Sequence, residues 1–414
     1  MLGPLLAFAP VPGAAPGSIA RREEGEVSVR GYVEGYYGCL LEWSDRTAIV
    51  SALAALGLNA YAYAPKEDAR HRLRWREPYE ASWRGAFAAF CAEARDRGVD
   101  VIAGLAPGID FDFASLDGGG DLDLATAKLA ALREDGANRL MLLLDDIDAD
   151  FERRAGGIAS EGEAHARLAN RLGERLDTAL VVVPRIYAGE LAVDAPDYLS
   201  DFAHALDARH AVSLCGRDIV AREVCPDDCR LPGEAGVRET ILWDNLYAND
   251  YCPRRLFVGP WCGRRGIDAV LLNATGRPAT DRLQLALMAA GMRDDEIGTS
   301  DAARAASARA VRVAHGVPPA FERLAEAFAH PTTNDRLDAH FPDVEATPAV
   351  LDALDELLWR WKTPLAREWY PQLFGLRQDL LLAADALPPD RVLKTQTPPL
   401  ARMLGAGGPT AIVR

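Results

Sequence analysis

The feature that most constrains the fold is an alternation of short apolar runs with longer, helix-like stretches from about residue 27 onward. We expect eight strands, at 27–34, 59–64, 100–106, 139–145, 179–184, 210–215, 239–243 and 267–273. The runs MLLLDD, ALVVVPRIY and DAVLLNA are almost continuously hydrophobic, which is typical of parallel strands buried on both faces. Eight such strands with helices between them predict an α/β fold, a (β/α)₈ barrel of the TIM type.

Helical patterns fill the intervals and continue after the last strand. In 83–98 and 125–136 the apolar residues recur at helical spacing, and a glycine ends each stretch. After about residue 300 the strand pattern disappears, and 379–386 again looks helical. One face of a further amphipathic helix is marked by Leu351, Leu354, Leu357, Leu358 and Trp361.

We therefore expect three parts: a flexible tail over 1–26, the barrel over 27–299 and an α-helical C-terminal domain over 300–414. Because amphipathic faces are usually buried within their own chain, we expect this domain to be a cap packed on the barrel. A dimerisation module, which would give a homodimer, is the alternative. The apolar start of the chain is broken by prolines and has no basic segment, so we interpret it as a tail, with a signal peptide as the alternative.

Charge and cysteine content exclude several classes of partner. The formal net charge of −15 repels phosphate backbones, so we expect no nucleic-acid partner. No run of 18 apolar residues occurs, so we expect no transmembrane helix and no membrane partner. Five of the seven cysteines are scattered, which indicates reduced thiols and a cytoplasmic location. The one close pair, Cys225 and Cys229, lacks the further ligands of a zinc site, and its role is open.

Polar and aromatic residues gather where the predicted strands end, which is where (β/α)₈ barrels form their active sites. Aromatic faces suit a pyranose ring, and carboxylate, amide and ammonium groups suit its hydroxyls and an amide substituent. The residues at these ends are Gly35, Lys66, Asp145, Asp146, Tyr187, Trp243, Asn245, Asp250, Tyr251 and Asn273.

The pair Asp145–Asp146 stands at the centre of this set. Successive side chains on a strand point to opposite faces, so both can serve one site only where the backbone turns at the strand's end. Two close carboxylates can divide into acid and base roles, because each raises the pKa of the other. Taken alone, the pair could equally be a helix N-cap followed by a surface acid.

Several segments together make a more specific pattern: VEGYYG, YAPKEDARHRLRWRE, LAPGIDF, LLLDDID, ILWDNLYANDY and VLLNA. In these segments, their order and their approximate spacing, the chain resembles glycoside hydrolase family 84, the O-GlcNAcase-like β-N-acetylglucosaminidases. The resemblance spans about residues 29–275, which is nearly the whole predicted barrel.

The resemblance implies a retaining exo-glycosidase that acts on β-linked N-acetylglucosamine, carried by a protein or a glycan, and needs no metal or cofactor. The 2-acetamido oxygen of the substrate would attack the anomeric carbon and form an oxazoline. Asp145 would orient the acetamido group, and Asp146 would be the general acid and base. Asp146 must then start protonated, which we expect the neighbouring negative charge to favour.

The other residues carry over one at a time. Gly35 and Lys66 match positions that contact sugar hydroxyls, and Tyr187 matches a tyrosine that binds the acetamide oxygen. Strand five reads PRIY where a more polar segment is expected, which makes Tyr187 the weaker match. Asn245 and Asn273 match asparagines that bind through their side-chain amides. Asp250 matches an acid that binds the hydroxyls on the far side of the sugar ring, and Trp243 and Tyr251 would form walls of the pocket.

Two alternatives remain open at this stage. The first alternative is a chitinase of glycoside hydrolase family 18, whose series of acidic residues is matched by Asp145, Asp148, Asp150 and Glu152. In that interpretation Glu152 would be the proton donor. That interpretation requires strand four to continue past Asp150, whereas the apolar run stops at Leu144. The second alternative is a non-catalytic carbohydrate-binding barrel, because a fold does not imply an activity.

Overall fold

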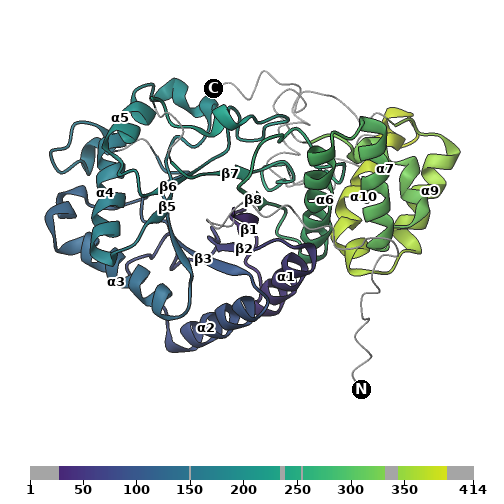
Figure 1. Ribbon diagram of the computed structural model, residues 1–414. Coiled ribbons are helices and arrows are strands. Elements are labelled where there is room, and N and C mark those ends of the chain that lie inside the picture. The colour runs from purple at the N-terminus through teal and green to yellow at the C-terminus, as the bar shows by residue number, and fades with distance from the viewer. Residues whose placement is uncertain (1–27, 149–150, 234–237, 253–254, 332–343, 389–414) are drawn as a thin grey trace.

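Eight parallel strands form a closed barrel in the order of the sequence (Figure 1). The computed structural model describes residues 28–148, 151–233, 238–252, 255–331 and 344–388. The strands are β1 Arg30–Glu34, β2 Ala60–Tyr63, β3 Asp100–Leu105, β4 Arg139–Leu143, β5 Leu180–Val183, β6 Ala211–Leu214, β7 Thr240–Asp244 and β8 Val270–Asn273. β1 pairs in parallel with β8, with Gly31 opposite Leu271, and this pairing closes the ring.

The predicted fold class is therefore confirmed. The largest differences are at the first and last strands, which we expected to begin at residues 27 and 267 and which begin at Arg30 and Val270. The tail predicted over 1–26 lies outside the described residues.

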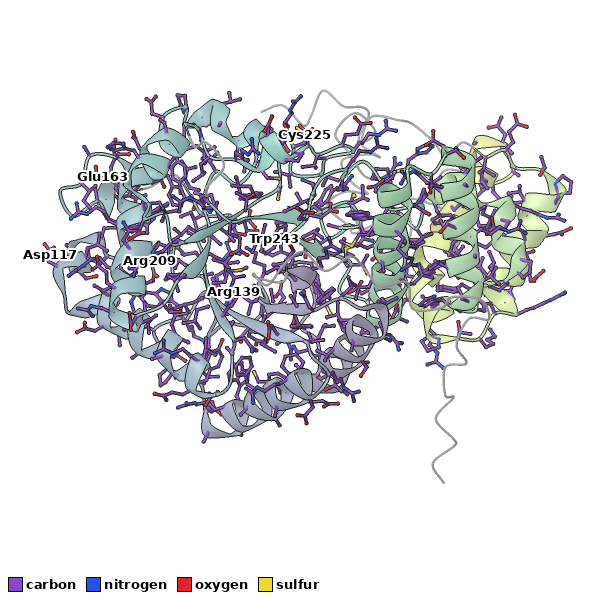
Figure 2. The ribbon with its side chains drawn as sticks, in the orientation of Figure 1. Asp117, Arg139, Glu163, Arg209, Cys225 and Trp243 are labelled. Carbon is purple, nitrogen blue, oxygen red and sulfur yellow. The ribbon has the colours of Figure 1, made fainter. Side chains whose placement is uncertain are left out.

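Alternation along each strand sorts the side chains into two buried sets. In β4, Met141 and Leu143 fill the interior of the barrel, whereas Leu140 and Leu142 face the surrounding helices. Trp243 of β7 belongs to the interior set, and Figure 2 shows it inside the ring of strands. Because side chains fill the interior, ligands have access only at the ends of the strands.

Helices surround most of the ring (Figure 1). They are α1 Trp43–Leu56, α2 Ala81–Asp96, α3 Gly120–Glu134, α4 Glu161–Leu176, α5 Tyr198–Ala205 and α6 Pro278–Ile297. The expected helices at 83–98 and 125–136 correspond to α2 and α3, each of which is followed by a glycine with positive φ, Gly98 and Gly136. None of the described helices is long and apolar enough to cross a membrane.

The expectation of a helix in every interval is wrong in two places. In the described part of the chain, no α-helix lies between β6 and β7 or between β7 and β8. The first interval carries only a 3₁₀ turn, η4 Pro226–Cys229, in a stretch interrupted by Pro232 and Gly233. In the second interval, the buried guanidinium of Arg264 donates hydrogen bonds to Asp244 and to the carbonyl oxygens of Ala221 and Arg222. These bonds connect the loop after β7 to the loop after β6.

A set of helices extends beyond α6, on one side of the barrel (Figure 1). It contains α7 Asp301–Ala314, α9 Pro348–Trp359 and α10 Pro364–Ala383, with 3₁₀ turns η5 Pro319–Arg323 and η6 Ala325–Phe328. The predicted apolar stripe is largely buried within the chain, although Trp361 lies past the end of α9. The stretch expected to be helical at 379–386 overlaps the end of α10. The domain boundary near residue 300 and the choice between a cap and a dimerisation module stay predictions.

Two polar contacts tie these helices to the barrel. The carboxylate of Glu368 accepts hydrogen bonds from the Ala279 and Thr280 amides, at 2.9 and 2.7 Å, and so caps the N-terminus of α6. Arg312 of α7 donates to the carbonyl oxygen of Val258 at 3.1 Å, and the Val258 amide donates to the carbonyl oxygen of Phe328 at 3.1 Å. The C-terminal helices therefore support both α6 and the loop between β7 and β8.

The Glu368 contact predicts a stability effect. Glu368→Ala removes the acceptor for the α6 amides and should lower the free energy of unfolding by about 2 kcal/mol. Urea-induced unfolding followed by circular dichroism measures this, with Glu356→Ala on the exposed face of α9 as the control. Equal losses in the two variants would mean that the cap contributes nothing specific.

Candidate active site

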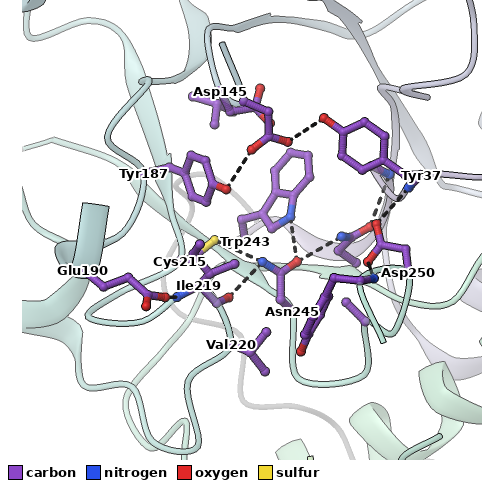
Figure 3. A pocket seen from close by; sticks show the side chains of 16 residues that line it. Tyr37, Asp145, Tyr187, Glu190, Cys215, Ile219, Val220, Trp243, Asn245 and Asp250 are labelled. Carbon is purple, nitrogen blue, oxygen red and sulfur yellow. Dashed lines mark hydrogen bonds between the residues drawn. The ribbon is translucent and has the colours of Figure 1, made fainter. Parts of the chain in front are cut away.

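A cavity of about 360 Å³ opens at the carboxyl ends of the strands (Figure 3). It is lined by Gly35, Tyr37, Asp145, Asp146, Val183, Tyr187, Glu190, Cys215, Ile219, Val220, Trp243, Asn245, Ala248, Asp250, Tyr251 and Asn273. All of the site residues expected from the sequence except Lys66 are in this set, and Lys66 lies directly behind Asp145 as its ion-pair partner.

Asp145 follows the end of β4 and is only 6% exposed. Its Oδ2 forms an ion pair with Lys66, which comes from the loop between β2 and α2 and is itself buried. Its Oδ1 is also buried and has no hydrogen-bond partner among the described residues. A buried acceptor without a donor is unfavourable, so this oxygen is available for an N–H group of a ligand.

Asp146 has a left-handed backbone, with φ +54°, which is uncommon for a residue other than glycine. This turn brings two consecutive side chains to one pocket, which an extended strand would not allow. The Asp146 carboxylate accepts hydrogen bonds from Tyr187 at Oδ1, 2.8 Å, and from Tyr37 at Oδ2, 2.9 Å. Figure 3 shows the two tyrosines on opposite sides of the aspartate pair.

The two carboxyl groups have pKa values shifted in opposite directions. Burial raises the pKa of Asp145, although Lys66 opposes the shift. Burial also acts to raise the pKa of Asp146, but Lys66 and the hydrogen bonds from Tyr187 and Tyr37 outweigh it, and the pKa is lowered. The pKa of Lys66 is lowered by burial and raised by the two carboxylates. The net shift is upward, so Lys66 keeps its charge.

This result corrects one expectation from the sequence. We expected the neighbouring negative charge to keep Asp146 protonated. In the ligand-free pocket, the two hydroxyl donors and Lys66 instead stabilise its ionised form. A ligand that removes one of these hydrogen bonds would raise the pKa of Asp146.

The floor of the pocket is a hydrogen-bonded group centred on Asn245. Its Oδ1 accepts from Trp243 Nε1 at 3.0 Å and from Asn273 Nδ2 at 2.9 Å. Its Nδ2 donates to the carbonyl oxygen of Ile219 at 2.9 Å and to Cys215 Sγ at 3.4 Å. These contacts use all four hydrogen-bonding positions of the amide, so Asn245 orients its neighbours in the ligand-free site. Its direct contact with a sugar stays a prediction.

Gly35 lies against this floor. A Cβ at this position would lie 2.2 Å from Cζ2 of the Trp243 ring, so only glycine leaves room for the indole. The amide of Gly35 donates to Asn273 Oδ1 at 3.3 Å, which joins the ends of β1 and β8.

Asp250 joins two loops at the mouth of the pocket. Its Oδ2 accepts from the Tyr37 amide at 2.9 Å, and its Oδ1 accepts from the Tyr251 amide at 3.1 Å. The side chains of Tyr37 and Tyr251 are exposed at this mouth. A carboxylate oxygen has more than one lone pair, so Asp250 can still accept from a ligand hydroxyl.

Sequence reasoning missed several residues of the pocket. Tyr37 belongs to the same VEGYYG segment as Gly35, so the assignment of Gly35 to the site could also have indicated Tyr37. Cys215, Ile219 and Val220 form an apolar wall after β6, and such residues carry no chemical pattern that distinguishes them from core. Figure 3 shows this wall on the same side of Trp243 as Glu190.

The acid series of the chitinase interpretation does not converge on the pocket. β4 ends at Leu143, and Glu152 is exposed on a 3₁₀ turn, η2 Phe151–Arg153. Neither Asp148 nor Glu152 lines the cavity, and Asp150 lies outside the described residues.

Within the described ranges, no group of three or more His, Cys, Asp or Glu side chains is placed to hold a metal ion. All seven cysteines are free thiols. Cys225 directly precedes η4 and Cys229 is its last residue, and the backbone amide of Cys225 donates to Asp228 Oδ2 at 2.8 Å.

Comparisons with known proteins find related sequences. A family model for β-N-acetylglucosaminidase matches residues 30–329. Protein O-GlcNAcase of Rattus norvegicus is 28% identical over 240 residues, and that of Mus musculus is 29% identical over 240 residues. Each match covers 56% of this chain and 26% of the relative, so it spans about a quarter of the curated proteins.

The fold also matches a solved structure. A mutant of the O-GlcNAc hydrolase of Thermobaculum terrenum superposes with a TM-score of 0.65, at 22% identity, over 89% of this chain and 78% of that chain. At this identity the likeness concerns the fold alone.

The buried ion pair predicts a pH-dependent stability effect. Lys66→Met leaves the Asp145 carboxylate buried without its cation and should lower the free energy of unfolding by about 3 kcal/mol at pH 8. The folded state then binds a proton at Asp145 more readily than the unfolded state does. The deficit should therefore shrink as the pH falls toward 5.

Chemical unfolding at pH 8 and pH 5 measures this effect. In the double variant Lys66→Met/Asp145→Asn, the deficit should depend less on pH, because Asp145 no longer titrates and only the more exposed Asp146 still responds to the loss of Lys66. A deficit in Lys66→Met that is the same at both pH values would show that Asp145 is not the buried charge responsible.

Proposed function

This chain belongs to the β-N-acetylglucosaminidase family, family 84 of the glycoside hydrolases, and from that premise we propose that it is a retaining exo-β-N-acetylglucosaminidase. The observation that carries the proposal is the pair Asp145–Asp146, two adjacent carboxylates in one pocket with opposite pKa shifts. Because the curated relatives are much longer than the matched region, their substrate comes to this chain only as part of the proposal.

The first chemical step uses the acetamido group of the substrate as the nucleophile. Its carbonyl oxygen forms a bond to C1, the bond from C1 to the glycosidic oxygen breaks, and Asp146 gives its proton to the leaving oxygen. The product is a protonated oxazoline, in which the nitrogen keeps its hydrogen. Held beneath C1, the amide oxygen has a very high effective concentration. The buried Oδ1 of Asp145 accepts the acetamido N–H and stabilises the positive charge that develops there.

The second step reverses the first with water. The Asp146 carboxylate takes a proton from water, the water oxygen bonds to C1, and the C1–oxygen bond of the oxazoline breaks. The acetamido group is restored, and the sugar is released with its original anomeric configuration. Two inversions at C1 make the reaction retaining.

Substrate binding also resolves the protonation state of Asp146. In the ligand-free pocket Tyr187 donates to Asp146 Oδ1 at 2.8 Å. When Tyr187 turns to the acetamide oxygen, Asp146 loses one donor that lowers its pKa, and the pocket excludes water as it fills. Both changes raise the pKa of Asp146 and favour its acid form at the moment when a proton donor is needed.

The shape and lining of the pocket favour a terminal sugar. A cavity of about 360 Å³ is at the small end of ligand sites. Asp250 at its mouth binds the far hydroxyls of the ring, Gly35 contributes to hydroxyl recognition, and Trp243 and Tyr251 form walls. Lys66 lies behind Asp145 and acts through its ion pair with that carboxylate. The aglycone leaves toward the exposed side and belongs to a protein or a glycan. The free thiols favour a reducing, cytoplasmic location.

Activity on 4-methylumbelliferyl β-N-acetylglucosaminide tests the assignment of the two aspartates. Asp145→Asn should lower kcat by about 10²- to 10⁴-fold. Asp146→Asn should keep more activity on this substrate than on one with a poor leaving group, because umbelliferone needs little protonation. Glu152→Gln is the control and should match the wild type.

An inactive wild-type protein that still binds N-acetylglucosamine would favour the non-catalytic carbohydrate-binding barrel. An inactive Glu152→Gln variant beside active aspartate variants would favour the chitinase-like mechanism.

A fluorinated N-acyl series tests the nucleophile. Fluorine withdraws electrons from the amide oxygen, so kcat should fall steeply from N-acetyl to N-fluoroacetyl to N-difluoroacetyl substrates. The rates are measured with the same aryl leaving group at saturating substrate. A flat series would mean that a protein carboxylate, and not the acetamide oxygen, attacks C1.

A further inference from the structure

We propose that Arg72 is a positioning residue for the general acid Asp146, an assignment that rests on the function proposed above and extends it. Arg72 lies in the loop between β2 and α2 that also carries Lys66. Arg72 is only 9% exposed to solvent. The loop therefore brings two buried cations to the aspartate pair, Lys66 beside both carboxylates and Arg72 beside Asp146.

The guanidinium of Arg72 has two separate contacts with the acid. Nη2 donates to the backbone carbonyl oxygen of Asp146 at 2.5 Å. Nη1 donates to the hydroxyl oxygen of Tyr37 at 2.5 Å, and that hydroxyl donates to Asp146 Oδ2 at 2.9 Å. One contact holds the backbone of Asp146, and the other reaches its carboxylate through Tyr37.

The backbone contact acts on the left-handed turn. A backbone at φ +54° is uncommon for a residue other than glycine, and it is less favourable than an extended backbone even for aspartate. The bond from Arg72 to the Asp146 carbonyl oxygen is a constraint on this turn. If Asp146 relaxed to an extended backbone, its side chain would point to the opposite face from Asp145. Arg72 thus keeps both carboxylates in one pocket.

The contact through Tyr37 sets the direction of a hydrogen bond. A guanidinium can only donate, so the Tyr37 hydroxyl must accept from Arg72 and give its single proton to Asp146 Oδ2. Oδ2 is then occupied. Oδ1 becomes free when Tyr187 turns to the substrate, so Oδ1 is the atom that carries the proton to the leaving oxygen.

Arg72 is not needed to hold its own loop. The ammonium group of Lys128 donates to the carbonyl oxygens of Arg70, Trp75 and Glu77, at 2.5, 2.8 and 2.6 Å, and ties the loop to α3. Removal of the Arg72 side chain therefore leaves the anchor of the loop in place. The effect of such a change should appear at Asp146, in the protonation of the leaving group.

The test compares two leaving groups in the full-length protein. Arg72→Met should lower kcat by about 100-fold on phenyl β-N-acetylglucosaminide, which needs a proton donor, and by less than about tenfold on the 4-methylumbelliferyl glycoside. KM should change little, because the substrate contacts stay. The basic limb of the kcat–pH profile should move to higher pH, because a positive group and an ordered donor that favour the Asp146 carboxylate are lost.

Three further variants sharpen the result. Arg74→Met is the matched control in the same loop, since the Arg74 side chain is 55% exposed and pairs only with Glu77 at 3.5 Å among the described residues. It should behave as the wild type. Tyr37→Phe should show the same dependence on the leaving group as Arg72→Met. In the double variant Arg72→Met/Tyr37→Phe, the fold-loss in kcat should be smaller than the product of the fold-losses in the two single variants, because both side chains act on the same carboxylate.

Equal losses on both leaving groups, or an unmoved basic limb, would overturn the inference and leave Arg72 a structural residue. A wild-type protein inactive on both glycosides would overturn the proposed function instead. If circular dichroism shows that Arg72→Met does not fold, Tyr37→Phe decides the case, and equal losses in that variant would overturn the inference.

Discussion

The parallel pairing of β1 with β8 is the contact on which the rest of the molecule depends. It closes the ring, removes both edges of the sheet and sets the end of β1 beside the ends of β7 and β8. Gly35 can then pack on Trp243 and donate to Asn273, a partner 238 residues away in sequence. The same closure sets the end of β4, with its aspartate pair, across one pocket from that floor.

The electrostatic surroundings then give two chemically identical side chains, Asp145 and Asp146, pKa values shifted in opposite directions. Asp145 is buried against Lys66, whereas Asp146 turns out of the strand toward two tyrosine hydroxyls. The hydrogen bonds from Tyr187 and Tyr37, together with Lys66, favour the ionised form of Asp146. In the proposed mechanism, a substrate that draws Tyr187 away raises the pKa of Asp146, so that binding of the substrate also favours the acid form. The C-terminal helices contribute at a distance, through Val258 and the loop that carries Asp250.

Much of this could be predicted from the sequence, because strand periodicity and glycine-ended helices are local properties. The apolar run of β4 and the acids that follow it located the end of the strand and the pocket. Protonation of Asp146 was predicted wrongly, since it depends on Tyr37 and Tyr187, which meet only in the closed barrel. The saturated amide of Asn245 likewise depends on tertiary contacts that no local pattern encodes. In the described residues between β6 and β7, by contrast, Pro232 and Gly233 are a local signal against an α-helix.

The stereochemistry of hydrolysis tests the central claim most directly. Proton nuclear magnetic resonance can follow the anomeric signal of the sugar released from an aryl β-N-acetylglucosaminide during the first minutes of the reaction. We expect β-N-acetylglucosamine to appear first and the α-anomer to grow in only as the sugar equilibrates in water. Initial release of the α-anomer would show a single inversion at C1, with water as the direct nucleophile, and would contradict a reaction through an oxazoline.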